Sequence, residues 1–160
     1  MLGALLPGAQ HLQNFHPLVV HFPLAFLPIA AILYLVAIVT GRDSLAWAGL
    51  GLLVLGTAAA AVAAGTGLYA EEGVMVARSV RAALLEWHER LMLTTVALNI
   101  VATAWAVLDR PLPRKGRFAF LLLLFVLTAI LTRGADYGGR MVYGYNAGGS
   151  ACGQPIEFTE

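Results

Sequence analysis

The run PLVVHFPLAFLPIAAILYLVAIVT, residues 17–40, contains 24 residues and no formal charge. A membrane-spanning helix needs about 20 mostly apolar residues, so this run is long enough to cross a bilayer. Three later runs have the same character, and polar breaks at 41–43, 71–73 and 109–117 separate them. We therefore predict an all-α fold, a bundle of four transmembrane helices at about 17–40, 44–70, 84–108 and 118–137, within a single domain (1–148) that a polar tail (149–160) follows.

The composition supports a membrane protein. Of the 160 residues, 59% are hydrophobic and 12% are charged, whereas soluble domains carry about 25% charged residues. The runs are apolar around the whole helix circumference, which argues against a soluble bundle with a single apolar stripe. A net charge of +1 gives no indication of nucleic-acid binding. The only cysteine, Cys152, leaves no partner for a disulfide within the chain and no CxxC or CxxCH motif. No internal repeat is visible.

Four spans place both chain termini on one side of the membrane. The loop at 109–117 carries four basic residues in nine positions, and short basic loops favour the cytoplasmic side. We therefore expect a multi-pass protein of the bacterial inner membrane, embedded in the lipid bilayer, with both termini on the outer, periplasmic side.

All four histidines fall on that outer side. His11, His16 and His21 precede or begin the first span, and His88 begins the third. His21 and His88 lie at a similar shallow depth, so two helices of a bundle can bring their rings face to face. Five residues separate His16 from His21, which is about 140° around a helix. We therefore expect these two rings to have different partners.

Other residues indicate how the spans pack and bend. Pro23 and Pro28 each remove a backbone donor and should bend the first span. Gly138 and Gly139 permit unusual backbone angles and could turn the chain at the outer end of the fourth span. The third span carries an inward-facing stripe at helical spacing, because polar side chains in a membrane helix generally face protein: His88, Met92, Thr95, Asn99 and Thr103.

Two facing histidines near a membrane surface suit one haem b, whose iron takes axial imidazole ligands. We predict His21 and His88 as the axial ligands, with His16 as a supporting or alternate ligand. The haem propionates would bind basic groups on the outer side, where Arg78, Arg81, Arg90, Arg133 and Arg140 lie. Of these, Arg90, Arg133 and Arg140 are the predicted cofactor-binding residues. A quinone is a second candidate cofactor. The function expected from this site is electron transfer between a periplasmic carrier or quinol and a larger redox complex, with other membrane or periplasmic redox proteins as partners.

Two other readings stay open. A cofactor-free structural or assembly subunit would use its histidines only for hydrogen bonds. An outward-facing divalent metal site could combine His16, His21 and His88 with Glu86 or Glu89. There is no GxSxG motif, and no acid or base lies in mid-span, so neither a hydrolase nor an ion-coupled transporter is indicated.

Three motifs resemble a bacterial family of four-span membrane proteins, domain of unknown function 2231. They are HPLVVHFPLA from residue 16, the histidine within LLEWHERLMLTTVALN from residue 84, and TRGADYGGRMVYGYNAG from residue 132. The likeness covers about residues 14–148. Members of that family occur alone or fused to redox and cytochrome c-type modules. The resemblance therefore implies an outward-facing electron-transfer role. Histidines that relatives often carry near the last motif are replaced here by residues such as Asp136, Tyr137, Tyr145 or Asn146, so a second centre is not expected.

Overall fold

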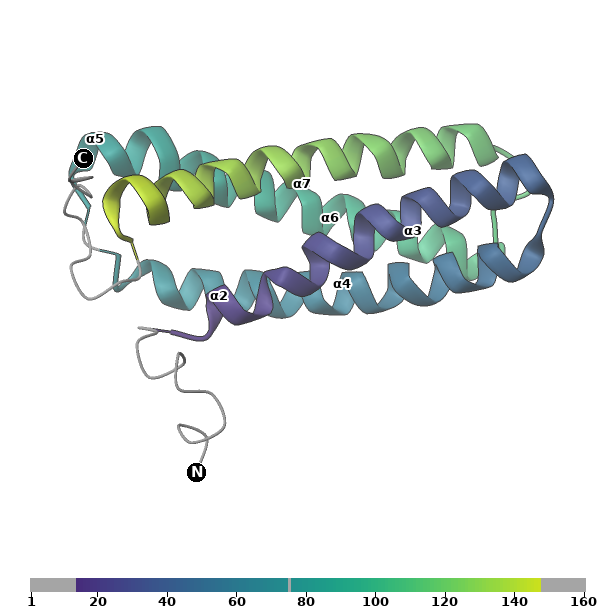
Figure 1. Ribbon diagram of the computed structural model, residues 1–160, viewed down its shortest axis with the longest axis horizontal. Coiled ribbons are helices and arrows are strands. Elements are labelled where there is room, and N and C mark those ends of the chain that lie inside the picture. The colour runs from purple at the N-terminus through teal and green to yellow at the C-terminus, as the bar shows by residue number, and fades with distance from the viewer. Residues whose placement is uncertain (1–13, 75, 148–160) are drawn as a thin grey trace, which may run out of the picture.

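The computed structural model describes residues 14–74 and 76–147, and all regular structure within them is helical. Four helical stretches are long and apolar enough to cross a membrane: His16–Thr40, Asp43–Glu71, Arg78–Leu108 and Arg117–Tyr145. This confirms the all-α, four-span architecture (Figure 1). The individual elements are α2 (His16–Val19), α3 (His21–Thr40), α4 (Asp43–Glu71), α5 (Arg78–Val80), the π-helix η2 (Arg81–Leu85), α6 (Glu86–Leu108) and α7 (Arg117–Tyr145).

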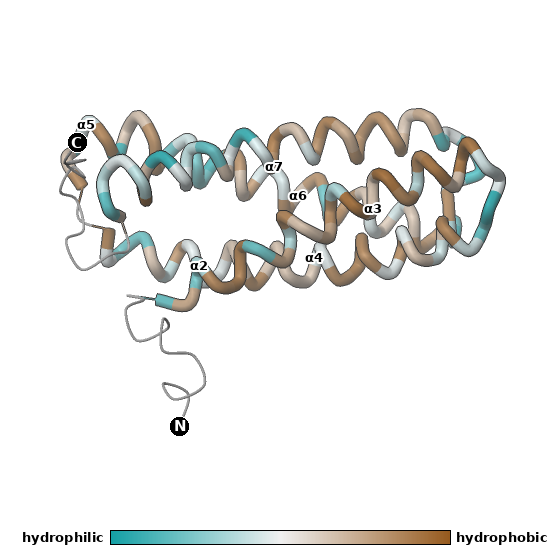
Figure 2. Tube along the Cα trace, viewed as in Figure 1, coloured by the Kyte–Doolittle hydropathy of each residue, from teal (hydrophilic) through white to brown (hydrophobic). Residues whose placement is uncertain are grey.

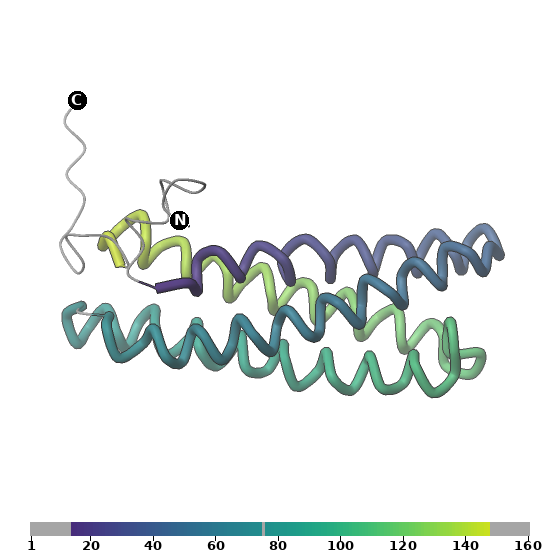
Figure 3. Tube along the Cα trace, turned by 90° about the horizontal axis from the view of Figure 1, so that it is seen from below, coloured from purple at the N-terminus to yellow at the C-terminus, as the bar shows by residue number. Residues whose placement is uncertain are grey.

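The helices form an up-and-down bundle. In the described part of the chain α3 contacts α4 and α7, and α6 contacts the same two helices, so α3 and α6 occupy opposite corners. Figure 3 shows all four running along the long axis of the molecule. The start of α2 and the end of α7 lie at one end, here called the terminal end, and the connections at 41–42 and 109–116 lie at the other, the loop end (Figure 1). The assignment of the terminal end to the periplasmic side stays a prediction.

The first span is interrupted near its start. α2 ends at Val19 and α3 begins at His21. Pro23 explains the break, because its ring nitrogen has no hydrogen to donate to the carbonyl of Val19. Pro28 lies inside α3, which continues past it. Gly41 ends α3 with φ of 67°, a left-handed conformation that favours glycine.

The core is densely packed at the loop end. Tyr34 is fully buried, its hydroxyl donates to the carbonyl of Pro111 at 3.1 Å, and its ring packs edge-to-face on Phe120 at 5.0 Å. Nearer the middle, the Thr57 and Thr103 hydroxyls lie 2.6 Å apart. Figure 2 shows apolar colour along the spans, with hydrophilic residues concentrated at the loop end and in the terminal-end parts of α6 and α7.

The inward stripe predicted for the third span is present, since Thr95 and Asn99 are both buried. The expected turn at the end of the fourth span was wrong. α7 runs straight through Gly138 and Gly139 to Tyr145, because glycine is tolerated inside a helix where a neighbouring group needs the space. The third helical stretch also starts earlier than 84, at Arg78. His11, Cys152 and the tail at 149–160 lie outside the described residues.

Candidate functional site

A cavity of about 440 Å³ opens at the terminal end between all four spans. Its volume falls in the range of small-molecule and cofactor pockets, about 300–1,000 Å³. Most of its lining is aliphatic or glycine. The ionisable side chains on its wall are His16, His21, His88, Glu71, Glu89 and Tyr143.

His16 reaches the cavity from α2 and leans on α4. Its Nδ1 lies 3.0 Å from the carbonyl oxygen of Ala63. A carbonyl can only accept, so Nδ1 carries the proton and, in a neutral ring, Nε2 keeps a free lone pair. The ring packs directly on Gly67, where an added Cβ would lie 2.9 Å from the imidazole Cε1. Gly67 is therefore required for this position of the ring. Asn14 holds the same residue from the other side, because its Oδ1 accepts the His16 backbone N–H at 3.0 Å.

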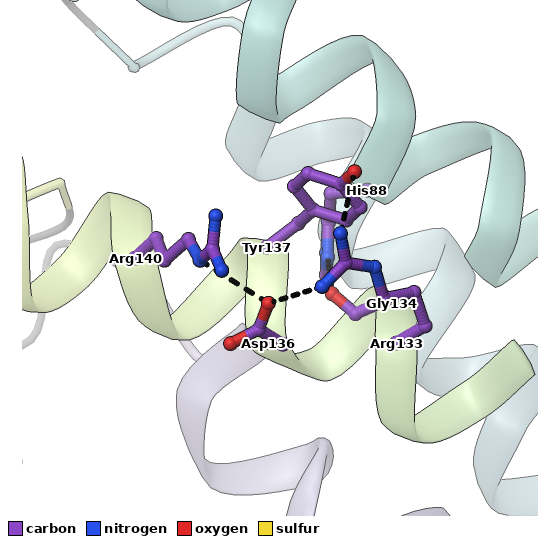
Figure 4. A network of polar contacts seen from close by, with 6 residues as sticks. All are labelled: His88, Arg133, Gly134, Asp136, Tyr137 and Arg140. Atoms are coloured by element: carbon purple, nitrogen blue, oxygen red, sulfur yellow. Dashed lines mark hydrogen bonds and ion pairs between the residues drawn. The ribbon is translucent and has the colours of Figure 1, made fainter. Parts of the chain in front are cut away.

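His88 repeats this arrangement on the other side of the cavity. It projects from α6 onto α7, where its Nδ1 donates to the carbonyl of Gly134 at 2.7 Å (Figure 4). A Cβ on Gly138 would lie 3.0 Å from the His88 Cε1. In both cases the carbonyl acceptor stands four residues before the glycine on which the ring lies. Both imidazoles thus have Nδ1 bonded to a carbonyl, and neither Nε2 has a hydrogen-bond partner within residues 14–74 and 76–147.

The rings of His16 and His88 lie next to each other. Their centroids are 6.5 Å apart and their planes are inclined by 83°. Metal–imidazole bonds are about 2.0–2.1 Å long, so two rings that share one metal ion have centroids about 6 Å apart. Histidine ligands also typically donate their second N–H to a carbonyl or carboxylate. The pair therefore has the separation and the tautomer of two imidazoles that bind a common metal centre.

A protein-family comparison covers all of the described residues. Residues 12–151 match the model of the family described as "Predicted membrane protein (DUF2231)". The chain belongs to this family. No curated protein and no solved structure matches it. Membership makes this DUF2231 protein an integral membrane protein of a family without an assigned function.

The structure brings His16, rather than His21, against His88 in this DUF2231 chain. His21 lies at the edge of the cavity and is exposed, and no hydrogen bond of its ring is found among residues 14–74 and 76–147. Its stripe continues through the exposed Ala25 and Ile29. His16 instead extends the inward stripe of the first span, which recurs at spacings of four and three: His16, Val20, Pro23, Leu27, Ala30 and Tyr34. This stripe has the same helical spacing as the one on the third span, but most of its members are apolar on a helix that is apolar all round, so polarity did not mark it in the sequence.

Arg133 and Arg140 lie away from the cavity wall. Both pair with Asp136, at 3.0 and 3.1 Å, and the Arg133 guanidinium lies 4.7 Å from the Tyr137 ring (Figure 4). These exposed groups lie on the outer surface of α7.

Arg90 and Arg81 differ in their relation to the cavity. Arg90 stacks over Trp87 at 5.7 Å and does not line the wall. Arg81 is closer to the site, because it binds two wall residues, Glu71 at 2.7 Å and the carbonyl of Val74 at 3.4 Å. Arg81 therefore lies nearer the cavity than Arg90, although it is not on the wall itself and its guanidinium is paired with Glu71.

The residues at the site do not form a metal cage of their own. Within residues 14–74 and 76–147, no group of three or more His, Cys, Asp or Glu is arranged to hold a metal ion. Structural zinc sites use four protein ligands and catalytic sites three. Two imidazoles therefore suit a metal whose other ligands come from a cofactor.

Proposed function

We propose that this protein binds one haem b between His16 and His88 and serves as an electron-transfer subunit of a membrane redox system. The observation that carries the proposal is the pair of imidazoles 6.5 Å apart, each tied through Nδ1 to a helix carbonyl and each on the wall of the same cavity. Electrons would pass between a periplasmic carrier or a quinol and a larger redox complex.

The chain's residues fit such a group. Membrane b-type cytochromes hold haem iron with two side-chain ligands and tune it by ligand identity, hydrogen bonding and burial. The cavity wall is largely aliphatic, and the two Nδ1–H···O bonds orient the imidazoles and raise the basicity of Nε2. Bound haem supplies a one-electron redox couple. Arg81 lies beside the wall but is paired with Glu71 at 2.7 Å, so a haem carboxylate placed there would replace Glu71 as its partner.

A cofactor-free structural role is the competing function. The bonds from His16 to Ala63 and from His88 to Gly134 each connect two spans, and they would brace the bundle without any ligand. This role does not require the two rings to converge on one cavity, which is the reason we place it second.

The visible spectrum of protein purified from haem-replete cells tests the proposal. The wild type should show a reduced-minus-oxidised α band and about one haem per chain, with the low-spin spectrum of two imidazole ligands. His16→Ala and His88→Ala should each lose that low-spin spectrum. His21→Ala is the matched control and should keep it, because His21 lies at the cavity edge.

Other outcomes identify the competing readings. A colourless wild type that also fails to take up added haem refutes the haem proposal and leaves the structural role. Loss of the low-spin spectrum in His21→Ala, with retention in His16→Ala, would restore His21 as the partner of His88. Metal analysis of the same sample reports any ion bound without porphyrin.

A further inference from the structure

The two histidine sites are related by nearly constant shifts along the chain. His16 and His88 are 72 residues apart in the sequence. Their carbonyl acceptors, on Ala63 and Gly134, are 71 apart, and so are the glycines under the rings, Gly67 and Gly138. Hairpin A is defined here as residues 14–74 and hairpin B as residues 86–147. Each hairpin thus carries a histidine at its head and the acceptor and glycine of that histidine on its second long helix.

The buried positions follow the same two shifts. All four buried residues of α6 stand 72 positions after buried residues of α2–α3, and five of the six on α7 stand 71 after buried residues of α4. Leu27 corresponds in this way to Asn99, and Ala60 to Leu131. Helical periodicity alone would allow several alignments. The histidines, the carbonyl acceptors and the glycines align hairpin A with hairpin B at these same two shifts. They do so independently of the pattern of buried positions.

The cavity wall repeats as well. Six wall residues of α2–α3 and six of α4 have a counterpart on the wall at the corresponding shift in hairpin B. His16 corresponds to His88, Val20 to Met92 and Ala64 to Ala135. The corners agree with this relation, since α3 lies opposite α6 and each touches both α4 and α7. That arrangement is what a two-fold axis along the bundle requires, and parallel repeats related by an axis along the membrane normal occur in other membrane proteins.

The large side chains show why no repeat is visible in the sequence. In hairpin A the bulk is on the first long helix: Leu27 packs on Gly56 and Tyr34 packs on Gly49. The corresponding pairs in hairpin B place the bulk on the second long helix instead: Asn99 with Leu127, and Ala106 with Phe120, all four buried. Exchange of large and small partners keeps the total volume similar and erases the sequence similarity.

We propose that the chain is an internal duplication of one helical hairpin, and that the cavity is a two-faced site on the axis between the copies. In that site His16 and His88 are equivalent ligands for the two faces of a planar metallomacrocycle. The nature of the occupant rests on the proposed function, whereas the equivalence of the ligands is a separate claim. His21 falls outside the equivalence, because its counterpart is Leu93.

Zinc protoporphyrin IX is the probe that separates these claims, since zinc in a porphyrin accepts one axial ligand. Binding to haem-free protein can be followed by the absorption of the porphyrin and by the emission of Trp87, the neighbour of His88. Either histidine should suffice, so His16→Ala and His88→Ala should each bind within about two- to threefold of the wild type, and the double variant at least about tenfold more weakly. Free imidazole should restore porphyrin binding to the double variant, which also shows that it is folded. His21→Ala should match the wild type.

Unequal variants overturn the equivalence. If only one of His16→Ala and His88→Ala loses porphyrin binding, and free imidazole restores that binding, the site is one-sided. A wild type that binds haem but shows this inequality keeps the proposed function and loses the two-faced site. A wild type that binds neither haem nor the zinc porphyrin refutes the proposed function. A double variant that binds as well as the wild type shows that neither ring is a ligand.

Discussion

Substitution of Gly67 by alanine tests whether the position of His16 depends on the absence of a side chain beneath its ring. The added Cβ would lie 2.9 Å from the His16 Cε1 and 3.2 Å from its Nδ1. Both atoms belong to a ring held by a 3.0 Å bond to Ala63. The ring must therefore move away from α4, and the bond to the carbonyl must lengthen or break. Gly65 is the matched control, since a Cβ there meets nothing within 4 Å.

The expected change follows from three contributions to the free energy of unfolding. Loss of the hydrogen bond costs about 0.5–1.5 kcal/mol, and insertion of a methyl group into a packed contact costs about 1–3 kcal/mol. Replacement of a helical glycine by alanine returns about 0.5–1 kcal/mol. Gly67→Ala should therefore destabilise the bundle by roughly 0.5–4 kcal/mol, whereas Gly65→Ala should stabilise it by about 0.5–1 kcal/mol.

Reversible unfolding by sodium dodecyl sulfate in mixed micelles, followed by circular dichroism, measures both variants without any ligand. Gly138→Ala should behave like Gly67→Ala, because its Cβ would lie 3.0 Å from the His88 Cε1. Gly144 offers the corresponding open control on α7. If Gly67→Ala proves as stable as Gly65→Ala, the close approach of His16 to α4 is not a feature of the folded protein.

Three further experiments test the interior and the cavity wall by the same unfolding assay. Asn99 is fully buried and its amide has no hydrogen-bond partner among the described residues. Asn99→Leu should therefore stabilise the protein by about 1–3 kcal/mol. A loss of stability would indicate that the amide has a hydrogen-bond partner in the folded protein. Thr57 and Thr103 should show a coupling energy of about 0.6 kcal/mol in a double-mutant cycle with valine, and no coupling would mean that their 2.6 Å contact does not persist. Glu71→Gln should reduce stability by less than about 1 kcal/mol, because the pair with Arg81 is partly exposed; a larger loss that salt does not reduce would show that the pair is shielded from water.

The third span shows what helical periodicity can predict from the sequence. Its stripe was predicted from polar residues alone, and Thr95 and Asn99 are indeed buried, because a membrane helix turns its polar side chains toward protein. In the first span the stripe is aliphatic on a helix that is apolar on all sides, so polarity does not mark the inward face. His21 therefore seemed as suitable as His16, until the packing of Leu27 and Tyr34 fixed the rotation of the helix.

The Gly138–Gly139 pair was interpreted as a turn because glycine permits turns. Its actual place inside α7 could not be predicted, since the reason for Gly138 is a ring on another helix, 50 residues earlier in the chain. The same holds for Gly67 and His16. A glycine that accommodates a distant side chain leaves no local signal.

The sequence by itself determined the number of spans, the all-helical class and the end of the bundle where the histidines gather. These properties follow from the length of each apolar run and from the even number of crossings. Only the tertiary structure decided which histidines meet, which carbonyls hold them and that the two hairpins share one register. Those properties depend on the rotation and the close approach of helices that are far apart in the chain, and hydropathy carries no information about either.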